Sequence, residues 1–290
     1  MAQLQASELT LNDKGRIYHL DLLDEDIADN IILVGDPGRV ELIAAKFSSV
    51  RFKTENREFV TMTGEYKGKE LTVISTGIGT DNIDIVLTEL DAIANIDLKS
   101  REIRADKRVL NIVRIGTCGA LINSVEPGDI IRSEYAIGLD GLAHFYEHDF
   151  SEDEGHLKTA FIAAAKWDKR LNQPYVKSAS KQLNKQFKDF GVGGITLTAN
   201  GFYGPQGRAL RLPLRYPNQQ YEFQTLNWQG LQLTNLEMET SGLYFMAAAL
   251  GHHALTICLV VANRNTKTFL PNYHEKMDGL INQILDRLTL

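Results

Sequence analysis

The chain has 290 residues, 43% of them hydrophobic, and a formal net charge of −6 at neutral pH. This apolar content suffices for a sizeable core, in one large domain or two smaller ones. The acidic balance argues against nucleic acid and membrane surfaces as partners, because both require a basic face. Two cysteines do not make a disulfide framework, so a cytoplasmic compartment is expected, and no apolar run predicts a membrane span.

Apparent strands and helices alternate along most of the chain. In chain order, we expect a buried strand at 31–34, a helix at 40–47, a hairpin at 59–76, a helix at 82–96, strands at 109–115, 129–138 and 191–199, a small-residue helix at 239–250 and an apolar strand at 254–261. The C-terminal segment places six apolar side chains on one helical face: Met277, Leu280, Ile281, Ile284, Leu285 and Leu288.

This alternation predicts an α/β fold with a largely parallel sheet covered on both faces. Ligands bind beyond the carboxyl ends of the strands in such sheets. Four motifs follow expected strands: GDPGR, GTCG, GFYGPQGR and ANR. The charged segment at 98–108 is interpreted as a solvated surface insertion, because acidic residues interrupt its basic ones.

The sequence Gly35-Asp-Pro-Gly-Arg39 lies between an expected strand and an expected helix. A glycine turn there exposes backbone N–H groups at a helix N-terminus, which together form an anion site. Arg39 adds a fork suited to phosphate oxygens. Taken alone, the stretch is better explained as a plain Pro-Gly turn that starts a helix. It is not a P-loop, because the Gly-Lys-Ser/Thr ending is missing.

A second glycine turn is Gly77-Ile-Gly79. Asn82 stands where a dinucleotide fingerprint needs its third glycine, so that fingerprint fails. We expect a tight strand-to-helix turn here.

Arg114 is expected at the end of a buried strand, where it needs an anion or a carboxylate as partner. A phosphate and a structural acid are equally good candidates. Thr117 adds a hydroxyl, and Cys118 is interpreted as a packed residue, because no base can be paired with it from the sequence.

Two acids, Glu237 and Glu239, flank Met238 at the start of an apolar helix. Acids in a first turn often only complement the helix dipole. Before so apolar a helix, we expect at least one carboxylate to face a cleft, where it suits a ribose diol.

The loop GFYGPQGR carries more side chains than a connection needs. Phe202 can pack on a flat ring, the Gln206 amide offers a donor beside an acceptor, and Arg208 is a charged donor. A ring with C=O, N–H and C=O in a row, such as uracil, matches this set.

The histidines are less informative. His144 and His148 have the i, i+4 spacing of a metal pair on a helix, but no third ligand is near, so a surface or packing role is favoured. His252 and His253 are expected to end a helix, and His19 lies near the N-terminus.

From about Tyr18 to Arg264, the chain resembles the nucleoside phosphorylase superfamily, in particular its hexameric, uridine-cleaving type. The resemblance is carried by eight motifs: IYHL, ILVGDPGRV, NREF, STGIG, RIGTCGAL, FYGPQGR, EMET and VANR. It implies one domain over residues 1–290, a three-layer α/β/α fold with a central mixed, partly barrel-like sheet. It also implies phosphorolysis of uridine to uracil and ribose 1-phosphate, with no cofactor and with inorganic phosphate as co-substrate.

The resemblance also assigns roles. Phosphate would be bound by Gly35, Arg39, Arg114, Thr117 and, from a neighbouring subunit, Arg57. Ribose would be held by Met238, Glu239 and the neighbour's His19, and uracil by Phe202, Gln206 and Arg208, with Arg264 behind the base loop. The catalytic residues would be Arg114, Gln206, Arg208 and Glu239. Shared sites imply a homo-oligomer, either a dimer or a trimer of dimers.

Two departures from the family pattern bear on specificity. The family often has G-x-P-S where this chain reads Gly79-Thr-Asp-Asn82, so no metal is predicted, with a monovalent cation near Glu58 as the alternative. Ala262-Asn263-Arg264 lacks the acid of the purine-cleaving relatives, which favours a pyrimidine, although another purine branch uses Asn. A purine or broad-specificity phosphorylase, a nucleosidase and a non-catalytic nucleoside-binding protein remain alternatives.

Overall fold

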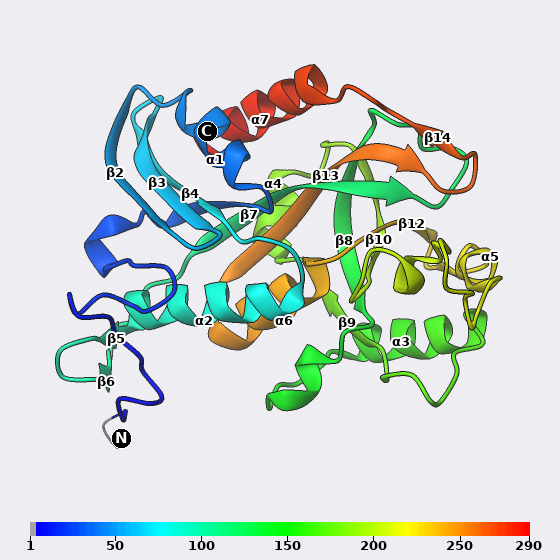
Figure 1. Cartoon of the computed structure of the whole chain (residues 1–290), viewed down its shortest axis with the longest axis horizontal. Coiled ribbons are helices and arrows are strands. Elements are labelled where there is room, and N and C mark those ends of the chain that lie inside the picture. The colour runs from blue at the N-terminus through cyan, green and yellow to red at the C-terminus, as the bar shows by residue number, and fades with distance from the viewer. Residues whose placement is uncertain (1–3) are drawn as a thin grey trace.

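The computed structural model describes residues 4–290, which fold around one large mixed sheet (Figure 1). Five strands close into a barrel: β7 (Asn111–Ala120), β8 (Ile130–Gly138), β10 (Val192–Thr198), β12 (Leu231–Glu237) and β13 (His253–Asn263). The ring closes where β12, parallel to β10 on one side, pairs antiparallel with β7 on the other, Asn235 opposite Ala120. The mixed, partly barrel-like sheet expected from the resemblance is therefore confirmed.

The sheet continues beyond the barrel from β7. Its further strands, in order, are β1 (Asn30–Val34), β4 (Lys69–Ser75), β3 (Phe59–Tyr66) and β2 (Ser49–Asn56). Three short strands, β9 (Tyr175–Ser178), β11 (Asn227–Trp228) and β14 (Thr268–Phe269), pair with β8, β12 and β13.

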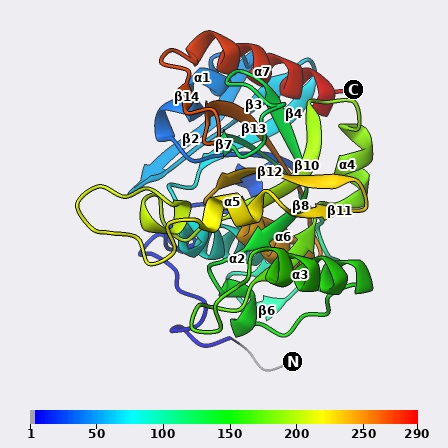
Figure 2. The same ribbon diagram turned by 90° about the vertical axis from the view of Figure 1, so that its right-hand side faces the viewer.

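Helices cover both sides of the sheet, which confirms the three-layer expectation. They are α1 (Pro37–Ala44), α2 (Thr80–Asn95), α3 (Glu152–Ala164), α4 (Lys181–Gln186), α5 (Gln219–Phe223), α6 (Thr240–Leu250) and α7 (His274–Leu288). In Figures 1 and 2, α1 and α7 lie above the sheet and α2 and α6 below it. The segment that contains α5 stands out from one end of the barrel (Figure 2).

The core explains why these segments take these forms. The central strands β1 and β7 are apolar on both faces because helices cover both, and Ile31, Ile32, Ile112 and Val113 are fully buried. The six apolar side chains predicted on one face of the C-terminal helix are all buried on α7. Within residues 4–290, no helix is both long and apolar enough to cross a membrane.

The expected strands and helices are all present, with shifted ends. The prediction that β7 stops near Ile115 is wrong, because the strand runs to Ala120 and leaves Arg114 in its middle. Gly116 reads as a strand breaker, yet a side chain there would clash with the Arg114 side chain and lie 2.9 Å from the Cys258 Sγ atom on β13, so close packing explains this glycine. Sequence reasoning gave no sign of β2, β9, β12, α3 or α4.

The segment at 98–108 forms a surface hairpin, in which β5 (Ile96–Asp97) pairs with β6 (Glu102–Ile103). Two of its arginines pair with acids of the N-terminal segment: Arg104 Nη1 lies 2.6 Å from an Asp24 oxygen, and Arg108 contacts Asp24 and Asp29 at 2.6 and 2.7 Å. These two charges are therefore neutralised locally, which fits the view that the segment forms no basic binding patch.

Candidate active site

A cleft of about 1100 Å³ opens at the carboxyl ends of the barrel strands. It brings together most of the predicted site residues: Gly35, Arg39, Arg114, Thr117, Phe202, Gln206, Arg208, Met238, Glu239 and Arg264. These residues come from the ends of β1 and β12, the middle of β7, the loop after β10 and the end of β13. The expectation that the motifs converge at this edge of the sheet is confirmed.

The cationic end of the cleft contains Arg39. The side chain of Asp36 caps α1 by accepting the Gly38 N–H at 2.9 Å, which starts the helix directly after the glycine turn. Arg39 is buried and donates from Nη1 to the Ile115 carbonyl at 3.1 Å. Burial and, to a lesser degree, the nearby Arg114 lower the pKa of Arg39. An anion placed here would relieve both penalties.

Arg114 lies deeper and is held by two carboxylates. Its Nη2 donates to Oε2 of Glu239, and its Nη1 lies 3.4 Å from Oε2 of Glu237. All three side chains are buried. Burial lowers the pKa of Arg114, but the two carboxylates outweigh burial and raise it. The structural carboxylate expected as a possible partner of Arg114 is therefore found, while its binding of phosphate stays a prediction. Its Nε has no hydrogen-bond partner within residues 4–290.

The two glutamates have different roles. Glu237 is the last residue of β12, and its carboxylate accepts the N–H groups of Glu239 at 2.9 Å and of Thr240 at 3.0 Å, which caps α6. The prediction that both acids open the helix is therefore wrong, because α6 begins only at Thr240. Glu239 faces the cleft, accepts the Gly79 N–H at 2.9 Å and has a pKa raised by burial.

The far end of the cleft contains Gln206 and Arg208. Arg208 donates from Nη1 to Oε1 of the buried Gln206 at 2.5 Å and to the Phe202 carbonyl at 2.7 Å. Its guanidinium lies 3.8 Å above the centroid of the Phe202 ring, so it covers one face of that ring. Burial, with the nearby Arg264, lowers the pKa of Arg208 to about 10. A half-buried cation whose charge is disfavoured in this way is well placed to bind negative charge.

Two side chains hold this loop from behind. Arg264 was predicted to support the base loop, and its Nη2 donates a hydrogen bond to the Gln206 carbonyl of that loop at 3.2 Å. Gln220, on α5, donates to the same carbonyl. Gly207 has φ +67°, and a side chain there would lie 2.5 Å from Nε2 of Gln220, so only glycine fits. Sequence reasoning missed Gln220, since nothing local marks a residue that acts 14 positions away.

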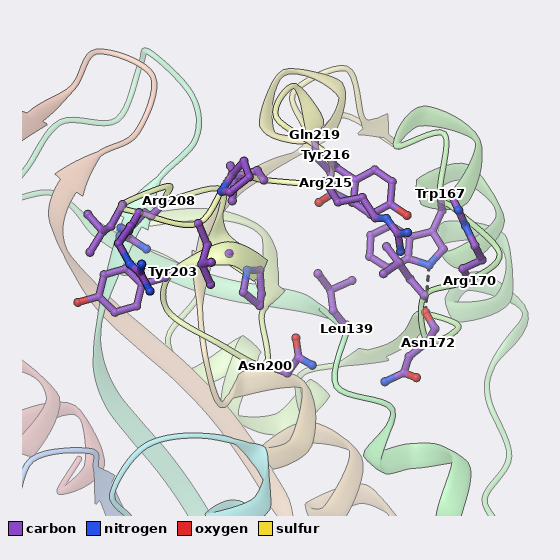
Figure 3. Close-up of a pocket in the computed structure, with 18 residues that line it drawn as sticks. Leu139, Trp167, Arg170, Asn172, Asn200, Tyr203, Arg208, Arg215, Tyr216 and Gln219 are labelled. Atoms are coloured by element: carbon purple, nitrogen blue, oxygen red, sulfur yellow. Dashed lines mark hydrogen bonds between the residues drawn. The ribbon is translucent and has the colours of Figure 1, made fainter.

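A second cavity of about 830 Å³ lies on the other side of this loop (Figure 3). Arg208 borders both cavities. In the close-up, Arg208 and Tyr203 lie at one end and Trp167, Arg170 and Tyr216 at the other. The loop thus separates the two cavities, and no sequence motif predicted the second one.

His19 and Arg57 lie outside the cleft and beside each other. Arg57 stacks on Tyr18, 5.6 Å from the ring centroid, and Asn56 donates to the His19 carbonyl at 2.8 Å. A groove of about 370 Å³ runs past Tyr18, Asn56 and Arg57. Both residues were predicted to act in a neighbouring subunit, and that assignment stays a prediction.

The turn between β4 and α2 matches its prediction. Gly77 and Gly79 have φ +70° and +100°, so the turn requires glycine. Asn82 Nδ2 donates to Oε1 of Glu58 at 3.3 Å. No group of three potential metal ligands was found among residues 4–290, and a monovalent cation near Glu58 stays untested.

His144 and His148 take the surface and packing roles that the sequence favoured, but they do not lie on one helix. Gly141 (φ +87°) starts a short 3₁₀ helix at Leu142–Phe145 that contains His144, and the chain is extended again before His148. His144 contacts the Gln173 carbonyl at 2.8 Å, and His148 packs on Phe245.

The remaining predictions concern His252, His253 and Cys118. Both histidines lie beyond the end of α6 at Leu250, so the prediction that they end the helix is wrong. His252 is buried and accepts the Leu110 N–H at 3.2 Å, while His253 begins β13. Cys118 is buried, and burial raises its pKa, as its predicted packing role requires.

Comparisons with known proteins agree with this fold and site. The model of the phosphorylase superfamily matches residues 29–286. Uridine phosphorylase from Thermococcus kodakarensis is 30% identical over 264 residues, covering 91% of this chain and 83% of the relative. Uridine phosphorylase from Haemophilus influenzae is 31% identical over 261 residues, covering 88% of this chain and 89% of the relative. A DeoD-type purine nucleoside phosphorylase from Colwellia psychrerythraea is 30% identical over 243 residues, covering 83% of this chain and 85% of the relative.

The structural comparison points the same way. A Trypanosoma brucei nucleoside phosphorylase, whose crystal structure is described as showing uridine phosphorylase activity, superposes with a TM-score of 0.87. It is 32% identical, with 97% of this chain and 99% of that chain covered. The barrel, and the cleft at its strand ends, define an α/β protein of the nucleoside phosphorylase fold. The chain belongs to the phosphorylase superfamily.

Proposed function

We propose that the protein is a pentosyltransferase that converts uridine and phosphate into uracil and ribose 1-phosphate. The observation that carries this proposal is the division of one cleft into two ends. Arg39 and Arg114 line one part of the cleft, and the Gln206–Arg208 pair lines another part, beside Arg264, which packs against Gly119 farther along β7 than Arg114. The relatives named uridine phosphorylase at about 30% identity support the same reaction.

The proposed reaction needs no covalent intermediate. Phosphate, bound by Arg39, Arg114 and Thr117 with the turn at Gly35, attacks C1′ of the ribose as the C1′–N1 bond breaks. The bonding electron pair passes to uracil, and the negative charge that develops on its oxygens is stabilised by Arg208 and Gln206. Binding both substrates in one cleft supplies the entropic share of the acceleration.

Ribose and base fill the space between the two ends. Glu239 and Met238 bind the ribose, and Phe202 borders the base. In this proposal, His19 and Arg57 complete the site from a neighbouring subunit, and their position outside their own cleft is compatible with that role. The active unit is therefore a homo-oligomer, a dimer or a trimer of dimers. Phosphate is a co-substrate, no cofactor takes part, and the compartment is the cytoplasm.

The main alternative function is that of a purine nucleoside phosphorylase, and the similarity to the Colwellia relative supports this alternative. Asn263 argues against it. Its Nδ2 donates to the carbonyls of Ile122 and Val125 at 2.8 and 2.7 Å, and its Oδ1 accepts the N–H groups of Asn265 and Thr266. An amide engaged on both sides has no atom left to bind a purine.

The test is base release from uridine and from inosine by the purified protein, with and without phosphate. We expect phosphate-dependent uracil release, and about 10⁴-fold less release from inosine, because inosine lacks the hydrogen-bonding pattern of uracil. Release without phosphate would make the protein a nucleosidase. Faster release from inosine would make it a purine phosphorylase, and binding of uridine without turnover would make it a nucleoside-binding protein.

A further inference from the structure

Glu89, on α2, holds His19 at three points. The His19 N–H donates to both carboxylate oxygens at 3.1 and 3.0 Å, and the Leu20 N–H donates to Oε2 at 2.8 Å. The third contact is the imidazole itself, whose Nδ1 lies 2.6 Å from Oε1. The Glu89 side chain is 12% exposed and that of His19 is 29% exposed. The carboxylate is thus sheltered, while the ring still reaches solvent.

This contact fixes which ring nitrogen is free. An ionised carboxylate only accepts hydrogen bonds, so Nδ1 must carry the proton and donate it to Glu89. Nε2 then remains for a substrate, and within residues 4–290 it has no hydrogen bond. The edges of Tyr18, with its ring centroid 4.9 Å from that of His19, and of Phe59, at 6.5 Å, limit rotation of the ring.

We propose that Glu89 is the positioning residue for His19 and, through it, for the 5′-hydroxyl of the nucleoside in the neighbouring subunit. This inference rests on the proposed function. Glu89 touches no substrate. It selects the tautomer of His19 and aims Nε2 outward, so the hydroxyl meets an oriented partner instead of a freely rotating ring. The same carboxylate anchors the backbone at His19 and Leu20, so a test must separate positioning from anchoring.

The test is Glu89→Gln, with kcat/KM measured for uridine and for 5′-deoxyuridine. Glutamine keeps the shape but offers one acceptor oxygen to three donors. We expect kcat/KM for uridine to fall about 10-fold and that for 5′-deoxyuridine to stay within about twofold. His19→Ala should give the same pattern. The double variant should lose no more than His19→Ala alone, because both changes remove one interaction.

Asp91→Asn is the matched control. It makes the same charge change two residues along α2, where Asp91 contacts Asn95 and His252 instead of His19. If this control substitution affects folding, it should lower kcat/KM for uridine and for 5′-deoxyuridine by the same factor and leave the ratio of the two values unchanged. Equal losses on both substrates in Glu89→Gln would reduce Glu89 to a backbone anchor and overturn the inference. The inference would also be overturned if the loss of kcat/KM for uridine in the double variant equalled the product of the losses in the two single variants.

Two further measurements keep the inference testable. If Glu89→Gln does not fold, ¹⁵N NMR of the histidine-labelled wild type replaces it, with His19 assigned by comparison with His19→Ala. The expected tautomer is protonated at Nδ1, and a ring protonated only at Nε2 would overturn the inference. Wild-type turnover of uridine is measured first. Its absence would remove the proposed function, and the inference with it, before any variant is compared.

Discussion

Arg114 donates a hydrogen bond from Nη2 to Oε2 of Glu239, and both side chains are buried in the cleft. Arg114, which is expected to bind phosphate, is therefore hydrogen-bonded to Glu239, which is expected to bind ribose. Glu237, 3.4 Å from Arg114 Nη1, supplies a second negative charge. Because two carboxylates face one arginine, Glu239 can turn one oxygen to a ribose hydroxyl while Arg114 keeps a partner.

We therefore predict that Glu239→Gln lowers kcat/KM about 10-fold for uridine, and clearly less for 2′-deoxyuridine. A carboxylate accepting from the 2′-hydroxyl forms a charge-assisted hydrogen bond worth roughly 1.5–3 kcal/mol, and the deoxynucleoside never forms it. Kinetics on both nucleosides at saturating phosphate measure the difference. Equal losses on the two substrates would contradict the assignment of Glu239 to the ribose.

Arg208→Ala should lower kcat/KM for uridine by about 10- to 100-fold or more, because a poorly solvated cation no longer meets the charge that develops on uracil. Steady-state kinetics with uridine measure the loss. Arg211→Ala is the control, since Arg211 is three residues away and lines only the second cavity. Wild-type-like turnover by Arg208→Ala would remove Arg208 from the site.

Arg39→Ala should raise the KM for phosphate more than it changes any other constant. The expected rise is about 10-fold or more, from the loss of charge-assisted hydrogen bonds to the anion. The readout is a phosphate titration at saturating uridine. Arg51→Ala serves as control, because Arg51 is an exposed arginine paired with Glu70 on the neighbouring hairpin. An unchanged KM for phosphate in Arg39→Ala would contradict its assigned role.

The order of strands and helices and the content of the cleft could be predicted because each depends on local patterns. Apolar runs marked β1, β7 and β13, and the motifs that follow β1 and β13 or lie within β7 converge because these parallel strands run toward one edge of the sheet. Where the sequence misled, a local pattern had two structural solutions. Acids before an apolar helix can lie in its first turn or, like Glu237, cap it from the preceding strand.

Tertiary contacts set the limit of the prediction. Gly116 looked like the end of a strand, but a side chain there would clash with Arg114 and with Cys258 on another strand. Gln220 supports the base loop from α5, and Glu89 holds His19 across 70 positions. None of these contacts leaves a spacing that a single sequence can reveal, because each joins residues that meet only in the folded chain.

The last prediction concerns Glu154, which ties the start of α3 to β9. Its carboxylate accepts the Ser178 N–H and the Ser151 N–H at 2.9 Å each, and Lys177 lies 3.2 Å away. Burial raises the pKa of Glu154, but the two backbone hydrogen bonds, the Ser178 hydroxyl and Lys177 together outweigh it and leave the pKa below its ordinary value of 4.5.

A carboxylate whose pKa is lower in the folded than in the unfolded protein stabilises the fold. This stabilisation is fully present at pH values above the unfolded-state pKa, and it is lost as the pH falls through the folded-state pKa. Urea unfolding should therefore find Glu154→Gln less stable than the wild type at pH 7, with the difference shrinking steadily below about pH 4.5. Asp153→Asn, the exposed acid beside it, should leave the pH dependence of the wild type unchanged. If the difference in unfolding free energy between Glu154→Gln and the wild type were the same at pH 7 and pH 3, the charge of the Glu154 carboxylate would not contribute to stability.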